Sequence, residues 1–310
     1  MKKAIVMAAI IGLLALAAGW SYNTFFSGGK LAVPELKATW HEWGVVNETV
    51  TEIRSTIIIY NPGGYSATVE SLTYEVYVND IRIAVGHLVE PARIEPKSNA
   101  TIRVRTFIDN TKIPDLWVSY VTNNENLHLE VEAQAVVKAF GLTLNVPISF
   151  SKDYRPEPPL EERLDIHEEY NITVNGQTLV TVKQVDTSWG TVTNETTQLI
   201  HNITLYNPNP FPIAISRMKY VAVVNDLTIA EGEQPMANLI LGPHEMKWVL
   251  VYTYINNTLL DDWWVSHVGN GEESDVDVTV FMVLENDILV PIYERSFTIQ
   301  TDLLEAMSYP

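Results

Sequence analysis

Cysteine is absent from this chain of 310 residues. Its absence excludes disulfides, thiolate metal ligands and cysteine nucleophiles together. Positive charge is also scarce, since 20 Lys and Arg stand against 38 Asp and Glu, which gives a formal net charge of −18 at pH 7. A surface this acidic repels phosphate backbones, and its charge mainly maintains solubility. We therefore expect no nucleic-acid partner.

The patterns of the common catalytic and metal sites are missing as well. No two of the seven histidines sit at metal-ligand spacing, and there is no Gly-x-Ser-x-Gly elbow or phosphate-binding glycine loop. The pair Asp261-Asp262 is typical of a helix start. Glu273, Asp275 and Asp277 lack the twelve-residue calcium-loop pattern and indicate a solvated face. We expect a protein that is not an enzyme and needs no cofactor or metal.

A long internal repeat is the strongest feature that the sequence does contain. Trp43-Gly44 and Tyr60-Asn61-Pro62 recur about 146 positions later as Trp189-Gly190 and Tyr206-Asn207-Pro208. The turn Val78-Asn79-Asp80 recurs as Val224-Asn225-Asp226, and after one inserted residue Trp117-Val118-Ser119 recurs as Trp264-Val265-Ser266. A repeat of this length is two copies of a whole domain rather than a solenoid unit.

Each copy reads as a series of short strands with one short helix. In the first copy, alternating apolar and polar residues predict strands that include 51–60, 67–78, 81–88 and 99–108. Asn79-Asp80 predicts a two-residue hairpin turn. Apolar residues at helical spacing predict a helix near Trp117, which Asn110 and Thr111 can cap. Many short strands with frequent turns indicate two tandem β-sandwiches, and the repeated tryptophans are interpreted as core.

The first 26 residues predict a membrane anchor. Lys2 and Lys3 precede an apolar run of about 17 residues, or roughly 23 with the aromatic flank, and a hydrocarbon core needs about 20. We favour an uncleaved transmembrane helix with a cytoplasmic N-terminus and an extracellular body; a cleaved signal peptide is the alternative. The lipid bilayer is then a partner. The expected divisions are 1–26 anchor, 27–34 spacer, 35–152 first domain, 153–163 stiff proline-rich linker, 164–302 second domain and 303–310 tail.

Two kinds of candidate surface residue follow from this topology. Six sequons become candidate glycosylation sites if the body is outside the cell: Asn47, Asn99, Asn171, Asn194, Asn202 and Asn256. Trp263 is a candidate surface contact, because the first copy has Leu116 at that position.

With these motifs in hand, the chain resembles the type-2 late embryogenesis abundant proteins, also called the water-stress-and-hypersensitive-response domain. The likeness spans about residues 35 to 302 and is strongest to archaeal members with two tandem domains behind a hydrophobic segment. The motif residues are Trp43, Gly44, Asn61, Pro62, Trp189, Gly190, Asn207, Pro208, Asn209 and Pro210. The first copy departs from the motif at Gly63-Gly64. The resemblance implies sandwiches of the fibronectin type III or immunoglobulin kind, a role in desiccation or stress tolerance, and no catalytic residues.

These observations lead to a hypothesis and an alternative. The hypothesis is a non-enzymatic envelope protein, tethered to the membrane and linked to stress tolerance. The alternative is a cell-surface adhesion module that recognises glycans or envelope proteins through loops at the ends of its sandwiches, with Trp263 and the Asn209-to-Pro212 loop as the surface to test.

Overall fold

The computed structural model describes residues 34–155, 158–285 and 287–304. Among them, one compact unit (unit 1) comprises 34–116, 127–154 and 301–304, and a second (unit 2) comprises 117–126 and the described residues from 155 to 300. The expected membrane anchor lies outside the described residues. No helix in the described part of the chain has the length and apolar character needed to cross a membrane.

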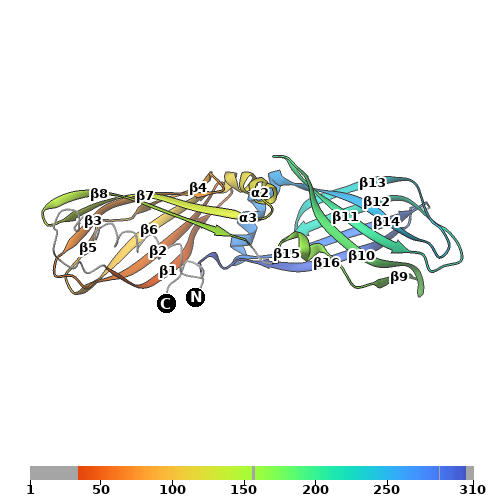
Figure 1. Ribbon diagram of the computed structural model, residues 1–310, viewed down its shortest axis with the longest axis horizontal. Helices are drawn as coiled ribbons and strands as arrows, with labels where there is room; N and C mark the ends of the chain where they lie inside the picture. Colours follow the sequence, from red (N-terminus) through yellow and green to blue (C-terminus); the bar gives the residue numbers. More distant parts are fainter. Residues whose placement is uncertain (1–33, 156–157, 286, 305–310) are drawn as a thin grey trace. The chain divides into compact units, whose positions relative to one another are not determined.

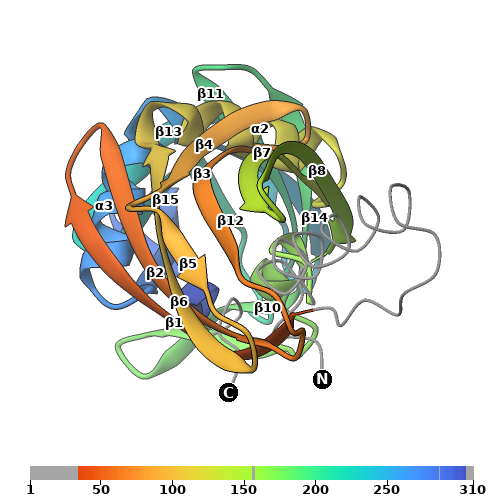
Figure 2. The ribbon, with the colours of Figure 1, turned by 90° about the vertical axis from the view of Figure 1, so that its left-hand side faces the viewer.

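Unit 1 is built from antiparallel strands. They are β1 (Glu35–Val46), β2 (Val50–Asn61), β3 (Ala67–Val78), β4 (Ile81–Leu88), β5 (Ala92–Ile94), β6 (Ser98–Asp109), β7 (Leu127–Ala139) and β8 (Leu142–Tyr154). The order across the sheet is β1-β2-β6-β4-β3-β7-β8, and β5 pairs with β3. Figure 2 shows these strands curving round, with β1, β2 and β6 on one side and β7 and β8 on the other.

This continuity differs from the two separate sheets that a sandwich would have. Strand β4 pairs with both β3 and β6, so it joins the two layers. At Gly86 a Cβ atom would lie 2.1 Å from the Tyr74 ring. The missing Cβ lets the Tyr74 side chain pass over β4 and form a hydrogen bond of 2.5 Å with the Thr106 hydroxyl on β6. The core lies between the layers and includes Ile57 and Leu72.

Unit 2 has two four-stranded antiparallel sheets (Figure 1). Their orders are β14-β11-β10-β9 and β13-β12-β15-β16. The strands are β9 (Tyr170–Val174), β10 (Gln177–Val192), β11 (Thr196–Tyr206), β12 (Ile213–Val224), β13 (Leu227–Leu241), β14 (Met246–Asn256), β15 (Glu273–Leu284) and β16 (Leu289–Gln300). The two sheets face each other, because the rings of His201 on β11 and Tyr293 on β16 are 5.8 Å apart. The chain is therefore mainly β, as predicted.

A short helix follows the sixth strand of the first copy and recurs in the second. Helix α2 spans Ile113–Thr122 after the 3-10 turn η1 (Asn110–Lys112), and α3 spans Leu260–Gly269 after η3 (Asn257–Leu259). Asn110 and Thr111, expected as caps, lie within the turn η1, and Asp109 caps that turn: its carboxylate accepts the backbone N–H of Thr111. The capping residue lies before Asn110 because a 3-10 turn, which begins at Asn110, precedes the α-helix.

The predicted hairpin turn agrees with the structure, and the predicted extended spacer differs from it. The hairpin at Asn79-Asp80 is confirmed, with φ of 49° and 65°, values that suit a primed two-residue turn. The segment expected as an extended spacer instead ends in the 3-10 turn η2 (Glu161–Leu164). Leu164, which the expected divisions place at the start of the second domain, is buried at 4% exposure in the core of unit 2.

Candidate functional site

The Trp-Gly motif marks an irregularity at the same place in both copies. The β1–β2 and β10–β11 pairings both shift register just after the tryptophan. A Cβ on Gly44 would lie 2.2 Å from Glu52 Oε2, and one on Gly190 would lie 2.3 Å from Gln198 Oε1. Without a Cβ, each side-chain oxygen reaches the backbone N–H that follows the glycine, at 3.1 Å in both copies. Glycine is thus required at this β-bulge, because a Cβ would occupy the place of the side-chain oxygen.

The Asn-Pro motif holds a loop through the asparagine side chain. Asn207 is fully buried. The two hydrogens of its amide Nδ2 are shared among the carbonyls of Phe211, Leu241 and Gly242, at 2.8, 3.1 and 2.9 Å. Its Oδ1 accepts the backbone N–H of Asn209 at 2.9 Å. This one side chain thus bonds backbone groups of its own loop and of the end of β13, where Leu241 and Gly242 lie.

The first copy uses a reduced form of the same device. Asn61 Nδ2 donates to the Tyr65 carbonyl, and its Oδ1 accepts from Gly63 N–H, both at 2.8 Å. The second Asn-Pro, absent from the first copy, adds Asn209 Nδ2, which donates to the carbonyls of Thr178 and Leu179. These prolines follow asparagines that bond to backbone, so the motif has a structural role here.

A buried carboxylate in unit 2 collects four hydrogen bonds. Glu125 is 2% exposed. Its oxygens accept from Trp189 Nε1 at 2.9 Å, the Tyr120 hydroxyl at 2.9 Å, and the backbone N–H groups of Leu160 at 2.6 Å and Glu161 at 3.2 Å. Glu125 comes from the helix end of the first copy, whereas Trp189 comes from the second. The segment 117–126 therefore belongs to unit 2 in space.

Trp117 lies beside this cluster. Its indole Nε1 donates to Thr197 Oγ1 at 2.9 Å, and its ring meets the Trp189 ring edge-on, with centroids 5.7 Å apart and an interplanar angle of 84°. Thr197 Oγ1 in turn donates to Asn257 Oδ1 at 2.9 Å. The polar edges of both tryptophans are thus bonded, and their carbon faces are left for packing.

Those faces border an apolar cavity of about 90 Å³ in unit 2, which is partly open to solvent. Trp117, Leu160, Trp189, Ala222, Trp263 and Phe297 are among the residues that line it. Both sheets, η2, α2 and α3 contribute to the wall. None of the lining residues that the structure describes is charged.

Every polar side chain in the cavity wall already has a partner. The third indole, of Trp263, donates to Ser274 Oγ at 2.9 Å. Thr253 Oγ1 is 3.1 Å from His201 Nε2. The Tyr220 hydroxyl bonds to the backbone of Tyr254. The indoles of Trp117 and Trp189 are bonded as well, so the described residues of the wall offer carbon and no unused polar side chain.

Behind this wall, His201 is fully buried between two hydroxyls. Thr187 Oγ1 is 3.0 Å from Nδ1, and Thr253 Oγ1 is 3.1 Å from Nε2. Burial lowers the pKa of His201 to about 4. The imidazole is therefore neutral at pH 7 and acts as a hydrogen-bonding core residue.

A second buried histidine bonds a serine. His267 Nδ1 is 2.8 Å from Ser274 Oγ, and both residues have 0% exposure. The Ser274 oxygen also accepts from Trp263 and from Asn225 Nδ2, so its own proton points to His267. A catalytic serine must meet substrate, and this one is sealed in the core. Among the described residues no group of three or more His, Asp or Glu side chains could hold a metal.

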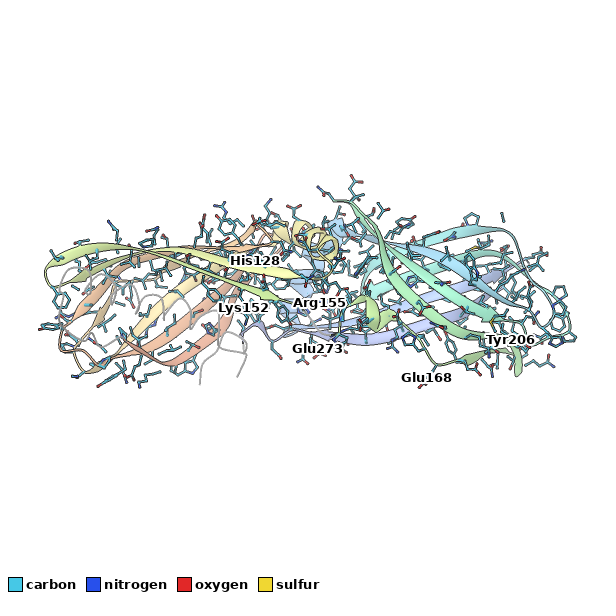
Figure 3. All side chains as sticks on the ribbon, in the orientation of Figure 1. His128, Lys152, Arg155, Glu168, Tyr206 and Glu273 are labelled. Atoms are coloured by element: carbon cyan, nitrogen blue, oxygen red, sulfur yellow. The ribbon has the colours of Figure 1, made fainter. Side chains whose placement is uncertain are left out.

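A second, more polar cavity of about 380 Å³ lies beside β9 and β16 of unit 2. Glu168, labelled in Figure 3, lines it together with Glu169, Tyr170 and Glu294. The Tyr170 hydroxyl donates to the Ile292 carbonyl at 2.6 Å, and burial raises the pKa of Tyr170 to about 12. The acidic groups here are solvated side chains around a structural tyrosine.

The sequons differ in exposure. Those at Asn47, Asn99, Asn171, Asn194 and Asn256 are exposed. Asn202 is half-buried in the middle of β11, and its Oδ1 is buried with no hydrogen bond. Asn47 and Asn256 use their side-chain oxygens to hold adjacent turns. Trp263, the candidate surface contact, is half-buried and borders the apolar cavity.

Sequence reasoning missed Glu125, His201 and the cavity. One signal was present: Glu125 and Glu272 occupy equivalent positions of the two copies, 147 residues apart (272 − 125). Both have a left-handed backbone, with φ of 61° and 66°, and both are buried. In the sequence, the visible signal is a glutamate at the same point of each repeat.

One comparison with known protein families agrees with the motifs of the first copy. Residues 56–152 match the family model described as late embryogenesis abundant protein, which supports that family for the first copy. A crystal structure of a protein from Archaeoglobus fulgidus is 26% identical with a TM-score of 0.37, covering 40% of this chain and 99% of that one. A protein from Arabidopsis thaliana is 14% identical with a TM-score of 0.29, covering 42% and 89%. A β-D-mannosidase from Dictyoglomus thermophilum is 8% identical with a TM-score of 0.26, covering 81% and 30%. No curated protein matches the chain.

Proposed function

We propose that this is a non-enzymatic protein of stress tolerance, with two tandem type-2 late embryogenesis abundant domains of the fibronectin type III kind. The observation that carries the proposal is the family match over residues 56–152, together with the repeat. The second copy has the same Trp-Gly bulge and Asn-Pro loop as the first. Apart from Asn202 Oδ1, the buried polar groups described above bond to backbone or to each other, which supports a structural role for them.

The proposal includes a membrane tether and an extracellular position, as expected of an archaeal tandem member. Its support is Lys2-Lys3 ahead of an apolar run, with an acidic body behind. Outside the cell, the exposed sequons become glycosylation sites. An acidic, hydrated surface held close to the bilayer is the proposed protective element.

The test is a deletion strain exposed to drying, heat and osmotic shock, complemented with the full gene or with a gene lacking residues 1–33. We expect the deletion to lower survival and the full gene to restore it. The truncated gene should restore it poorly if the tether matters. Survival equal to wild type in every stress would refute the stress role.

The adhesion module remains the second candidate. Phe211, in the loop after the second Asn-Pro, is 51% exposed. Trp263 is instead half-buried against the cavity, so Phe211 is the better residue to test. A glycan array with wild type and Phe211→Ala would show loss of a specific signal in the variant. No signal from wild type would count against adhesion to glycans.

A further inference from the structure

The cavity between the sheets of unit 2 is unlike the rest of this acidic protein. It is bordered by three tryptophans, and its other lining side chains are almost all aliphatic. A packing void would be unremarkable if it were smaller than a methyl group, but about 90 Å³ exceeds the space of a water molecule several times over.

The chemistry of the wall limits what can enter. Sugars, nucleotides and charged metabolites need hydrogen-bonding partners when they leave water. The three indoles, the Thr253 hydroxyl and the Tyr220 hydroxyl are all engaged elsewhere. Water is disfavoured for the same reason, because a buried water molecule needs two to four polar partners.

The volume sets the size of the occupant. An apolar cavity of about 150 Å³ can stay dry and accept benzene, which has six carbons. By proportion, a cavity of about 90 Å³ holds about four carbons. We propose that this cavity is a binding site for an uncharged saturated hydrocarbon group of about four carbons, either a free apolar molecule or the end of a longer chain. The inference does not depend on the proposed stress role.

The test uses the full chain and methyl NMR. Ile229, Ile255 and Ile299 line the cavity, so their methyl resonances report on it directly. Dissolved n-alkanes from propane to hexane are titrated one at a time. Affinity should rise about fourfold for each added methylene until the cavity is filled near butane, and should then stop rising.

Matched variants separate the cavity from general surface partitioning. Ala222 lines the cavity on β12, and Ala222→Leu should fill it and reduce butane affinity at least tenfold. Ala214 lies on the same strand but does not line the cavity, so Ala214→Leu should leave the affinity unchanged. Val278→Ala enlarges the cavity and should move the chain-length limit upward by one or two carbons. If Ala222→Leu does not fold, Val278→Ala still tests the proposal.

A further titration distinguishes the two sources of the ligand. If the end of a lipid chain can enter the cavity, dihexanoylphosphatidylcholine below its micelle concentration should compete with butane. If only free molecules can enter, butane should bind without competition. Both results support the hydrocarbon site. The proposal is overturned if no saturable shift of these methyls occurs, if affinity keeps rising to hexane, or if Val278→Ala leaves the limit in place.

Discussion

His201 shows how one buried side chain makes unit 2 sensitive to acid. Its pKa is lowered to about 4 by burial, below the ordinary value of 6.5. Between these values the unfolded chain binds a proton that the folded chain does not, so stability is present above pH 6.5 and is lost as the pH falls toward 4. The loss amounts to about 3 kcal/mol. Burial lowers the pKa of His267 as well, and this acts in the same direction.

The prediction is that His201→Gln flattens this dependence. The variant should be less stable at pH 7, because a packed side chain is replaced. Its free energy of unfolding should fall less than that of wild type between pH 6.5 and 4, and urea titrations at several pH values would measure the difference. Parallel curves for the two proteins would contradict the assignment.

Glu125 gives a second prediction at the scale of one residue. Glu125→Gln keeps one acceptor oxygen, but replaces the other with an amide that faces donors such as Leu160 N–H and the Tyr120 hydroxyl. Loss of hydrogen bonds to this buried carboxyl group should lower stability by about 2 to 4 kcal/mol. Urea unfolding followed by tryptophan fluorescence would measure it. The exposed control Glu231→Gln should change stability by less than about 0.5 kcal/mol, and an equal effect in both would refute the role given to Glu125.

At the scale of the element, the two asparagine loops form a natural comparison. Asn207 satisfies three carbonyls and one N–H, whereas Asn61 satisfies one of each. We predict that Asn207→Ala destabilises its loop by about 3 kcal/mol and Asn61→Ala by about 1 kcal/mol. Hydrogen exchange detected by mass spectrometry would resolve the loops separately. Equal increases in exchange at both loops would contradict the prediction.

The same comparison shows what the sequence could reveal about these elements. Alternation of apolar and polar residues predicted β3 and β4 with their observed bounds, because one face of each strand meets a core. The repeat also marked Gly44, Gly190, Asn61 and Asn207 as special before the bulges and loops explained them. Such local rules cannot place β4 against both β3 and β6, because that depends on how Tyr74 crosses Gly86.

The cavity and the Glu125 cluster needed the tertiary structure. Glu125 and Trp189 are 64 residues apart in the chain, and no periodicity brings them together. His201 had a hidden counterpart: in the first copy His41 bonds Ser55 across the same strand pair, with the histidine on the opposite strand. Both copies therefore pair a histidine with a hydroxyl at the same point. Aligning the two sequences position by position does not show this, because the histidine and the hydroxyl residue have exchanged strands.

The whole molecule carries a formal charge of −18, which weakens the folded state through self-repulsion. Most ion pairs in the described part of the chain are exposed and contribute little. Raising the ionic strength from about 10 mM to about 300 mM should therefore raise the melting temperature, because screening weakens repulsion more than it weakens these pairs. Thermal unfolding at several salt concentrations checks this; a fall in melting temperature would mean that the ion pairs dominate.

The same charge decides how the protein could be held at a membrane. An acidic body is repelled by anionic lipid headgroups, so attachment through its surface should be weak. We therefore expect any firm attachment to come from the apolar segment near the N-terminus. The full chain should remain in the membrane fraction after washing with high salt and with alkaline carbonate, whereas a chain lacking residues 1–33 should be released.

Replacing Lys2 and Lys3 with Glu removes the charge that sets orientation and should expose less of the body to protease outside the cell. Recovery of the truncated chain in the membrane fraction would instead point to a partner protein, and would overturn the proposed tether.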